Sequence, residues 1–478
     1  MNVVYGFLTV TAVVGALWWA FARGRFPRAL AVVSLVSLGL AAVTLLAVGL
    51  HWQLVPWQVL ATACAAAATL RWWWPGHSRG WSRVLGRLGL LTGLTLGGAG
   101  LLFVAVPVLP RPSGPHLVGS VVFRWTDAQR PETFTTSAGE RRQVVAQAWY
   151  PTETPGPPVR YFEAQERLPG YVDPYPAWFY GDFDQVDTHA SASAPVSAER
   201  PTWPVLVFLP GWGAPRESYS GLCADLASHG YVVVALSHPY ESAVSVLADG
   251  RVVGAAVGAS VFGANMADMT PIRAADSRFV LDQLGRLSEV EPGSPLVGHL
   301  DIQHTGIVGH SMGGAAAAQA VAEEPRFRVG VNLDGTLPAA LVGGWHLGAP
   351  FLWLQSDGQQ QTSYLQGRDE LMGGLQRGGD VLVVGGSVHQ SFTDTQSYFS
   401  ATGRRMLGDG ARPEAVDDIT WETSEVIAAF VGQYLGVPGE QSLDEAVARR
   451  PSIKQEQHIA SVLPNPPTIS LANERSSP

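Results

Sequence analysis

The chain has 478 residues, of which 46% are apolar and only 15% are charged, against about 25% in an average soluble protein. The charge is unevenly distributed: residues 1–110 hold seven Arg and no Asp or Glu, so the rest of the chain carries 24 basic and 40 acidic residues. This distribution excludes a uniformly soluble chain, and it argues against binding nucleic acid, which needs a basic face to neutralise phosphates.

Four apolar runs occupy most of the first 110 residues, at Val3–Ala22, Ala29–Leu50, Leu54–Leu70 and Leu88–Leu109. A membrane-spanning helix needs about 20 apolar residues, a length that three of the runs reach. A cleaved signal peptide is disfavoured, because no positive charge precedes the first run and three more runs follow it. Since no acidic residue interrupts these positions, we expect a four-helix transmembrane region rather than buried helices of a soluble fold.

The arginines between the runs predict an orientation for this region. The segments Arg23–Arg28 and Arg71–Arg87 contain all seven of them, whereas the segment His51–Gln53 contains none. Positively charged loops stay on the cytoplasmic side of a membrane. We therefore expect a multi-pass protein of the cell membrane, embedded through its N-terminal helices, with the residues after Leu109 forming an extracytoplasmic domain.

From His116 onward, strand-like and helix-like segments alternate. Strands are expected at Ser120–Phe123, Gln143–Tyr150, Val205–Leu209, Tyr231–Leu236, Thr305–Val308, Val329–Leu333, Phe351–Gln355 and Val381–Val384. Helices are expected at Tyr219–His229, Met266–Leu284, Ala315–Val321 and Asp417–Tyr434. This alternation predicts an α/β fold with a mostly parallel central sheet that helices cover on both faces.

Two segments depart from the alternation. Residues Thr152–Pro204 show no period, and we expect an excursion that covers a pocket with an aromatic wall. The wall is expected to consist of Tyr161, Phe162, Tyr171, Tyr175, Trp178, Phe179 and Tyr180. The chain after Gly436 is polar and rich in Pro and Ser, which predicts a disordered tail. The expected organisation is thus a transmembrane anchor at 1–110, a folded domain at 111–436 and a tail at 437–478.

One motif carries chemistry. Gly309-His310-Ser311-Met312-Gly313 fits G-x-S-x-G, and it follows an apolar strand and precedes an Ala-rich helix. In this context the small residues allow a sharp turn that lifts the serine hydroxyl above the sheet, and the helix N-terminus favours developing negative charge. The pattern predicts that Ser311 is a nucleophile.

A serine nucleophile needs a histidine base, which follows the serine in chain order with an acid between them. His389 comes five residues after a strand, in a glycine-containing loop that can fold back over the sheet edge. His346, between two strands, and His458, in the tail, are weaker candidates, and we expect His310 to be structural.

The acid has two candidates, Asp334 and Asp357, which follow successive strands, and the spacing does not choose between them. An oxyanion hole needs two backbone N–H groups. We expect one from Met312, directly after the nucleophile. The other is expected from Trp212, at the centre of the turn Gly211-Trp212-Gly213, for which a plain turn is the alternative.

Two segments around the candidate His and acid are Ser387–Asp394 and Asn332–Gly335. They resemble the His segment and the acid segment of the platelet-activating factor acetylhydrolases of the plasma and intracellular type II kind. Leu226–Tyr231, Ala148–Pro151 and Pro115–Gly119 are also similar. The resemblance spans about residues 111–434 and implies an α/β-hydrolase fold.

The resemblance also implies a catalytic triad of Ser311, Asp334 and His389, and it thereby favours Asp334 over Asp357. It implies cleavage of short acyl chains from phospholipids without a metal or cofactor. Two features depart from the family pattern: the turn at Gly211-Trp212 has a different sequence, and the animal enzymes lack the expected anchor.

We therefore expect a serine carboxylic-ester hydrolase, a lipase or esterase whose substrate is a small-molecule or lipid ester. The alternatives are a polyester hydrolase, a dienelactone-type hydrolase, an acyltransferase, or a catalytically silent hydrolase-fold binding module in the membrane.

Overall fold

The computed structural model describes residues 107–135, 139–170, 177–256, 262–338, 347–407, 416–437 and 441–462, together with a few isolated positions between 32 and 62. The chain divides into two compact units. One unit comprises Met1–Val106, Pro176–Asp182 and Tyr398–Met406. The other comprises Pro107–Tyr175, Phe183–Ser397 and Leu407–Pro478, and it contains all the candidate catalytic residues.

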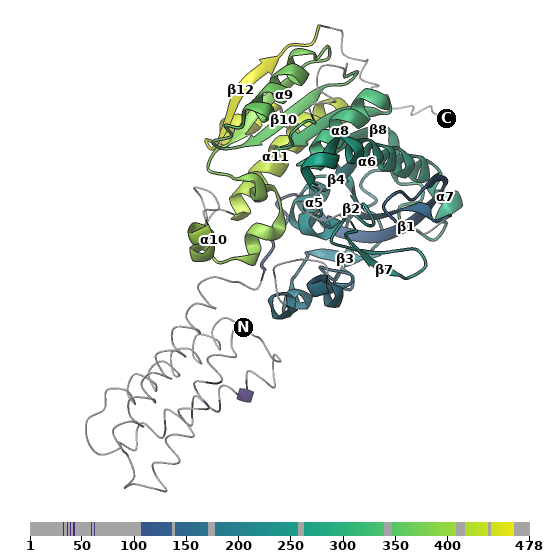
Figure 1. The fold of residues 1–478 in the computed structure, drawn as a ribbon, viewed down its shortest axis with the longest axis vertical. Coiled ribbons are helices and arrows are strands. Elements are labelled where there is room, and N and C mark those ends of the chain that lie inside the picture. The colour runs from purple at the N-terminus through teal and green to yellow at the C-terminus, as the bar shows by residue number, and fades with distance from the viewer. Residues whose placement is uncertain are drawn as a thin grey trace, which may run out of the picture. The chain divides into compact units, whose positions relative to one another are not determined.

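A ten-stranded sheet forms the centre of the second unit, in the order β12-β11-β10-β9-β8-β4-β5-β2-β1-β3 (Figure 1). Its strands are β1 (Leu117–Pro131), β2 (Arg141–Thr152), β3 (Ala190–Ala192), β4 (Trp203–Leu209), β5 (Val232–Ser237), β8 (Leu300–His310), β9 (Phe327–Leu333), β10 (Phe351–Ser356), β11 (Gly379–Val384) and β12 (Ile453–Ile459). A separate antiparallel pair consists of β6 (Val244–Val246) and β7 (Val252–Gly254).

The expectation of a mostly parallel sheet was wrong, because the sheet is mixed. Strands β5, β4, β8, β9, β10 and β11 run parallel, but β2 pairs antiparallel with β5, β1 with β2, and β12 with β11. The sequence between β1 and β2 is short, so these strands return directly on one another. A parallel pairing needs a crossover of a dozen or more residues.

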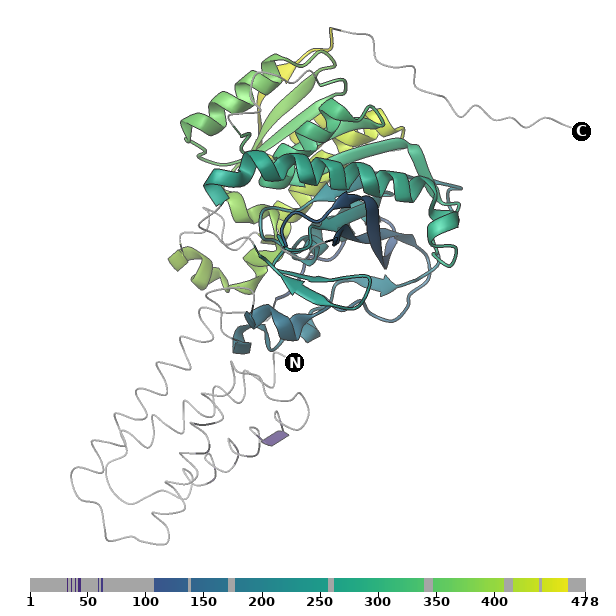
Figure 2. The ribbon, with the colours of Figure 1, turned by 45° about the vertical axis from the view of Figure 1, so that its right-hand side comes forward.

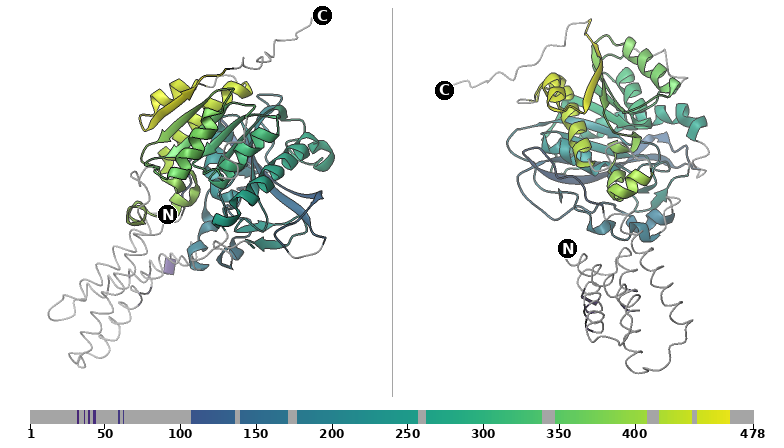
Figure 3. Two further views of the ribbon diagram at one scale, coloured as in Figure 1. Left: turned by 45° about the horizontal axis from the view of Figure 1, so that its top comes forward. Right: turned by 90° about the vertical axis from the view of Figure 1, so that its left-hand side faces the viewer.

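Helices cover both faces of the sheet (Figures 2 and 3). Residues of α6 (Phe262–Gly285), α8 (Met312–Glu323) and α9 (Thr362–Gly373) pack in one apolar cluster, and residues of α5 (Ser220–Ser228), α11 (Val416–Leu435) and α12 (Leu443–Arg449) pack in another. The two clusters lie on opposite faces of the sheet, because successive side chains of a strand point to opposite faces. In β4, Val205, Val207 and Leu209 belong to the first cluster, and Leu206 and Phe208 belong to the second. The described residues also form two shorter α-helices, α7 (Leu287–Val290) and α10 (Ala401–Leu407).

The chain after Gly436 differs from the expected disordered tail. It continues in α12 and in β12, which forms the sheet edge beside β11 (Figure 1). Leu443, Ala446 and Ile453 are buried there, whereas most of β12 is exposed. Only one residue of β12 is buried, so the sequence of this edge strand is mostly polar. That polar composition is the reason why a tail was expected.

The excursion at Thr152–Pro204 contains short 3₁₀ helices and β3, which pairs parallel with β1. Tyr161 and Phe162 are buried, with ring centroids 4.6 Å apart. In the other unit, the ring of Phe179 lies 5.9 Å from that of Phe399. Of the expected aromatic wall, Tyr171 and Tyr175 lie outside the described residues.

The expected transmembrane region is not supported. In the described part of the chain, no helix is both long enough and apolar enough to cross a membrane. The two longest, α6 and α11, carry charged side chains such as Asp276 and Glu422. The expectation of a multi-pass membrane protein, embedded through N-terminal helices and with an extracytoplasmic domain, is corrected accordingly. The four apolar runs lie almost wholly outside the described residues.

The register of the parallel strands aligns the ends at which the candidate residues stand. His310 at the end of β8 pairs with Leu333 at the end of β9, and Leu209 of β4 pairs with Gly309. Ser356 of β10 pairs with Val384 of β11. The residues that follow these strands therefore lie together at the carboxyl ends of the strands, where ligands bind in open α/β sheets.

Candidate active site

Ser311 stands at the sharp turn between β8 and α8. Its backbone has φ = 57° and ψ = −126°, a left-handed conformation that a residue with a side chain rarely adopts. Two glycines make the turn possible: a Cβ on Gly309 would lie 2.0 Å from the carbonyl oxygen of Gly313, and one on Gly313 would lie 2.0 Å from that of Leu209. The backbone N–H of Ser311 donates to the carbonyl of Leu333 (2.9 Å), which fixes the turn against β9.

His389 lies between the other two predicted triad residues. Its Nε2 is 3.0 Å from Oγ of Ser311, and its Nδ1 is 2.7 Å from Oδ2 of Asp334. The histidine begins a 3₁₀ helix (His389–Phe392) after β11, and 42% of its side chain is exposed. The structure thus brings Ser311, His389 and Asp334 together in hydrogen-bonding distance, with the histidine open to solvent.

Asp334 is buried at the end of β9 and is surrounded by hydrogen-bond donors. Its Oδ1 accepts from the backbone N–H of Ser356 (2.9 Å) and the hydroxyl of Tyr364 (3.3 Å), and its Oδ2 accepts from the hydroxyl of Ser356 (2.9 Å). Burial acts to raise the pKa of Asp334, but the hydrogen bond and charge of His389 and the bonds from Ser356 outweigh it, and the net pKa is lowered. The carboxylate is therefore ionised beside the imidazole.

The alternative acid, Asp357, has a different setting. It is exposed, and its Oδ2 accepts from the backbone N–H of Gly386 (2.8 Å), in the loop before His389. The imidazole of His389 instead contacts Asp334. Of the weaker histidine candidates, His458 lies on β12 against Asp380 (2.7 Å), and His346 lies outside the described residues.

His310 is buried beside Ser311 and links three parts of the candidate site. Its Nε2 lies 2.9 Å from the carbonyl oxygen of His389, so this nitrogen must carry the proton and donate. Its Nδ1 then accepts from the hydroxyl of Tyr219 (2.8 Å), whose oxygen in turn accepts from the N–H of Gly211 (2.8 Å). Burial, and then the nearby charge of His389, lower the pKa of His310 to about 3, which keeps it neutral. The sequence did not reveal Tyr219, Ser356 or Tyr364, because their contacts span elements far apart in the chain.

Of the two predicted oxyanion donors, Met312 directly follows Ser311 in the chain, and Trp212 directly follows Gly211, which lies close to Ser311. Trp212 lies in the turn after β4, followed by Gly213 with φ = 70°, and Met312 is the first residue of α8. A Cβ built on Gly211 would lie 3.3 Å from Cβ of Ser311, so this turn lies against Ser311.

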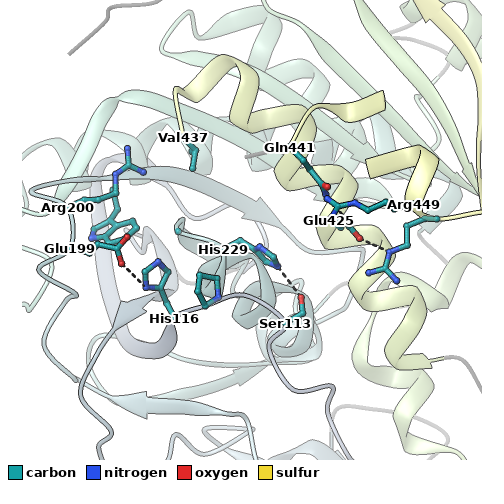
Figure 4. A pocket seen from close by; sticks show the side chains of 13 residues that line it. Ser113, His116, Glu199, Arg200, His229, Glu425, Val437, Gln441 and Arg449 are labelled. Carbon is teal, nitrogen blue, oxygen red and sulfur yellow. Dashed lines mark hydrogen bonds and ion pairs between the residues drawn. The ribbon is translucent and has the colours of Figure 1, made fainter. Parts of the chain in front are cut away.

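A separate pocket of about 600 Å³ lies among charged side chains (Figure 4). His116 faces Glu199 there (3.7 Å), and His229 lies 3.0 Å from the hydroxyl of Ser113. The pocket contains none of the predicted catalytic residues. Its residues Arg200 and Gly230 precede parallel strands rather than follow them, so it lies at the opposite ends of those strands from Ser311.

The described residues contain no cluster of three His, Cys, Asp or Glu side chains that could hold a metal ion.

Comparisons with known proteins show which family and which solved structures this chain resembles. Residues 176–251 and 293–433 match the family model "Platelet-activating factor acetylhydrolase, isoform II". A platelet-activating factor acetylhydrolase of Cavia porcellus is 28% identical over 262 residues, which cover 49% of this chain and 58% of that protein. A probable 1-alkyl-2-acetylglycerophosphocholine esterase of Arthroderma benhamiae is 27% identical over 276 residues, which cover 54% of this chain and 65% of that protein. The resemblance to the platelet-activating factor acetylhydrolase family is confirmed.

A solved structure is also similar. The ferulic acid esterase from Streptomyces cinnamoneus superimposes with a TM-score of 0.60 at 26% identity, covering 74% of this chain and all of that one. The α/β-hydrolase fold is thereby supported. The matched segments span less than two thirds of the length of the Cavia porcellus and Arthroderma benhamiae relatives.

The segment that follows His389 is tied to α5 and to Tyr161 by a buried acid. Asp394 accepts hydrogen bonds from the backbone N–H of Gly221 (3.1 Å) in α5 and from the hydroxyl of Tyr161 (3.2 Å). Burial raises the pKa of Asp394 to about 7. The folded state therefore holds a proton on this group that the unfolded chain releases near pH 4.

This difference predicts a pH-dependent stability. Because the pKa is higher in the folded state, the stabilisation is fully present below about pH 4 and is lost as the pH rises to about 7. Asp394→Asn removes the titration, so its unfolding free energy should rise relative to the parent between pH 4.5 and 7.5, by on the order of a few kcal/mol. Urea unfolding at both pH values measures this change. The exposed Asp357→Asn is the control. If the unfolding free energies of Asp394→Asn and the parent differ by the same amount at both pH values, the raised pKa of Asp394 is contradicted.

Proposed function

We propose that the protein is a serine carboxylic-ester hydrolase. The observation that carries the proposal is the position of His389, whose two ring nitrogens contact the hydroxyl of Ser311 and the carboxylate of Asp334. The similarity to acetylhydrolases and to a ferulic acid esterase supports the same chemistry.

In the proposed mechanism, Nε2 of His389 takes the proton of the Ser311 hydroxyl as its oxygen attacks the ester carbonyl. The resulting imidazolium gives this proton to the departing alcohol, and water then attacks the acyl-enzyme with His389 again as base. Asp334 holds Nδ1–H of the imidazole, which keeps the correct tautomer and stabilises the imidazolium. The bonds from Ser356 and Tyr364 support this arrangement, because they keep the carboxylate ionised and in place.

The negative charge that develops on the carbonyl oxygen needs fixed donors. We propose the backbone N–H groups of Met312 and Trp212. The first is supported by its place directly after the nucleophile at the start of α8, and the second by the contact of its turn with Ser311.

For the substrate we propose esters of short acyl chains, including phospholipids that carry one. The support is the similarity to platelet-activating factor acetylhydrolase and to the probable 1-alkyl-2-acetylglycerophosphocholine esterase. The buried rings of Tyr161 and Phe162 lie in the excursion that we expect to limit the acyl site. We also propose that the catalytic domain extends past residue 436 to include β12, since this strand completes the sheet beside β11.

The purified full chain should hydrolyse p-nitrophenyl esters, fastest with acyl chains of a few carbons, and then phospholipids with a short acyl chain. Ser311→Ala should lower kcat by about 10⁴–10⁶, because the nucleophile is lost, while circular dichroism shows the fold intact. Initial rates across a chain-length series measure both effects.

Three outcomes would overturn parts of this proposal. Activity of Ser311→Ala within tenfold of the parent would contradict the role of Ser311 as the nucleophile. A rate optimum at acyl chains of sixteen carbons or more would contradict the preference for short acyl chains. Faster formation of a new ester than of free acid on adding an alcohol would make the protein an acyltransferase.

The choice of acid has its own test. Asp334→Asn should lower kcat by at least about 10³, because the amide favours the wrong imidazole tautomer, whereas Asp357→Asn should stay within about tenfold of the parent. The two variants are matched, since each replaces an aspartate after a neighbouring strand. Steady-state kinetics with one ester compare them, and the reverse order of losses would move the acid to the end of β10.

A further inference from the structure

The turn after β4 is held by a buried arginine that lies outside the predicted site. Arg273 of α6 is 1% exposed. Its Nη1 donates to the carbonyl of Pro210, and its Nη2 donates to the carbonyl of Gly211 (3.3 Å). One planar guanidinium thus holds two successive carbonyl groups of the turn that precedes Trp212.

This contact fixes the direction of the Trp212 N–H. In a trans peptide unit the C=O and the N–H point in opposite directions, and the C=O of Gly211 belongs to the same unit as the N–H of Trp212. Drawing that carbonyl toward Arg273 therefore turns the N–H away from it. The neighbouring N–H, that of Gly211, is already bound to the hydroxyl of Tyr219 (2.8 Å), so both peptide units of the turn are held in place.

Arg273 is itself held by an acid. Nε of Arg273 donates to both carboxylate oxygens of Glu241 (2.8 and 3.1 Å), and Nη2 also contacts this carboxylate. Glu241, in the loop after β5, is as buried as the arginine. A buried ion pair is weak evidence for stability, because desolvation offsets the attraction between the charges. Because Arg273 also donates to two carbonyl groups of the turn, we infer that the ion pair fixes the conformation of this turn.

We propose that Arg273, fixed by Glu241, is a positioning residue that aims the Trp212 N–H at the developing oxyanion. This inference rests on the proposed ester hydrolysis and deepens it. Preorganised donors are what give an oxyanion hole its effect, and the loss of one donor costs about 10²–10³ in kcat. Arg273 does not touch the ester, so its removal should act on the transition state through the turn and leave substrate binding largely unchanged.

The test compares an ester with its thionoester, in which sulfur replaces the carbonyl oxygen. Sulfur accepts hydrogen bonds poorly, so the rate ratio of ester to thionoester reports how well the oxyanion hole binds. In Arg273→Lys the charge stays paired with Glu241, but the fork that holds two carbonyls is lost. We expect kcat for the ester to fall by about 10–10³ with KM nearly unchanged, and the ester-to-thionoester ratio to fall by a similar factor.

The matched control is Arg142→Lys. Arg142 is also buried and ion-paired, with Glu132 (3.0 Å) and Asp276 (2.6 Å), but it contacts no part of the turn. Its variant should keep the parent's ratio. The double variant Arg273→Met with Glu241→Met covers the case in which lysine still reaches both carbonyls, and it leaves no carboxylate unpaired. Titration of active serines with a fluorophosphonate normalises all rates to folded enzyme.

A ratio that stays at the parent's value in both Arg273 variants would overturn the inference, whether or not both substrates slow down, because a purely structural role lowers both rates alike. Failure of the proposed function would look different. The parent itself would then hydrolyse neither substrate above the level of Ser311→Ala.

Discussion

The backbone of Ser311 adopts φ = 57° and ψ = −126°, a conformation that costs on the order of 1–3 kcal/mol in a residue with a side chain. The surrounding chain makes it possible. Gly309 and Gly313 lie so close to neighbouring backbone atoms that a Cβ at either position would clash with them. The backbone N–H of Ser311 donates to Leu333 of β9. A strand can therefore end at His310 and a helix can begin at Met312 with one residue between them, and that residue presents its hydroxyl at the sheet edge.

The remaining geometry follows from where this turn sits in the sheet. Because His310 and Leu333 pair across β8 and β9, the residues after them are neighbours, and Asp334 emerges beside the nucleophile. The buried carboxylate receives donors from β10 and α9, and it receives the imidazole from the loop after β11. One chain of hydrogen bonds runs through His310, Tyr219 and Gly211, and it links the end of β8 to the His389 backbone and to the turn after β4. The site is thus held by residues at the ends of β4, β8, β9, β10 and β11.

The sequence predicted those parts of the molecule that local pattern controls. The apolar strands of the sheet centre and the G-x-S-x-G motif are visible because burial and tight turns impose composition. The polar edge strand β12 was not visible, since only Ile453 of its first residues is buried. The choice between Asp334 and Asp357 could not be made from spacing, because each stands at the end of a strand and is followed by a glycine. The family resemblance favoured Asp334, and the structure separates the two, because the imidazole of His389 contacts Asp334 whereas Asp357 accepts from the backbone of Gly386. The contacts of Arg273 could not be predicted from the sequence either, because its partners lie about 60 and 30 residues away in the chain.

The central claim is that Ser311 is an activated nucleophile. Its most direct test is covalent trapping: the full chain is treated with a fluorophosphonate, digested and analysed by mass spectrometry. A serine whose proton is taken by His389 reacts with this reagent, whereas an ordinary hydroxyl does not. The account predicts one phosphonyl group per chain on the peptide that contains Ser311, and no labelling after His389→Gln. An unlabelled Ser311, or a label on a different serine, would contradict it.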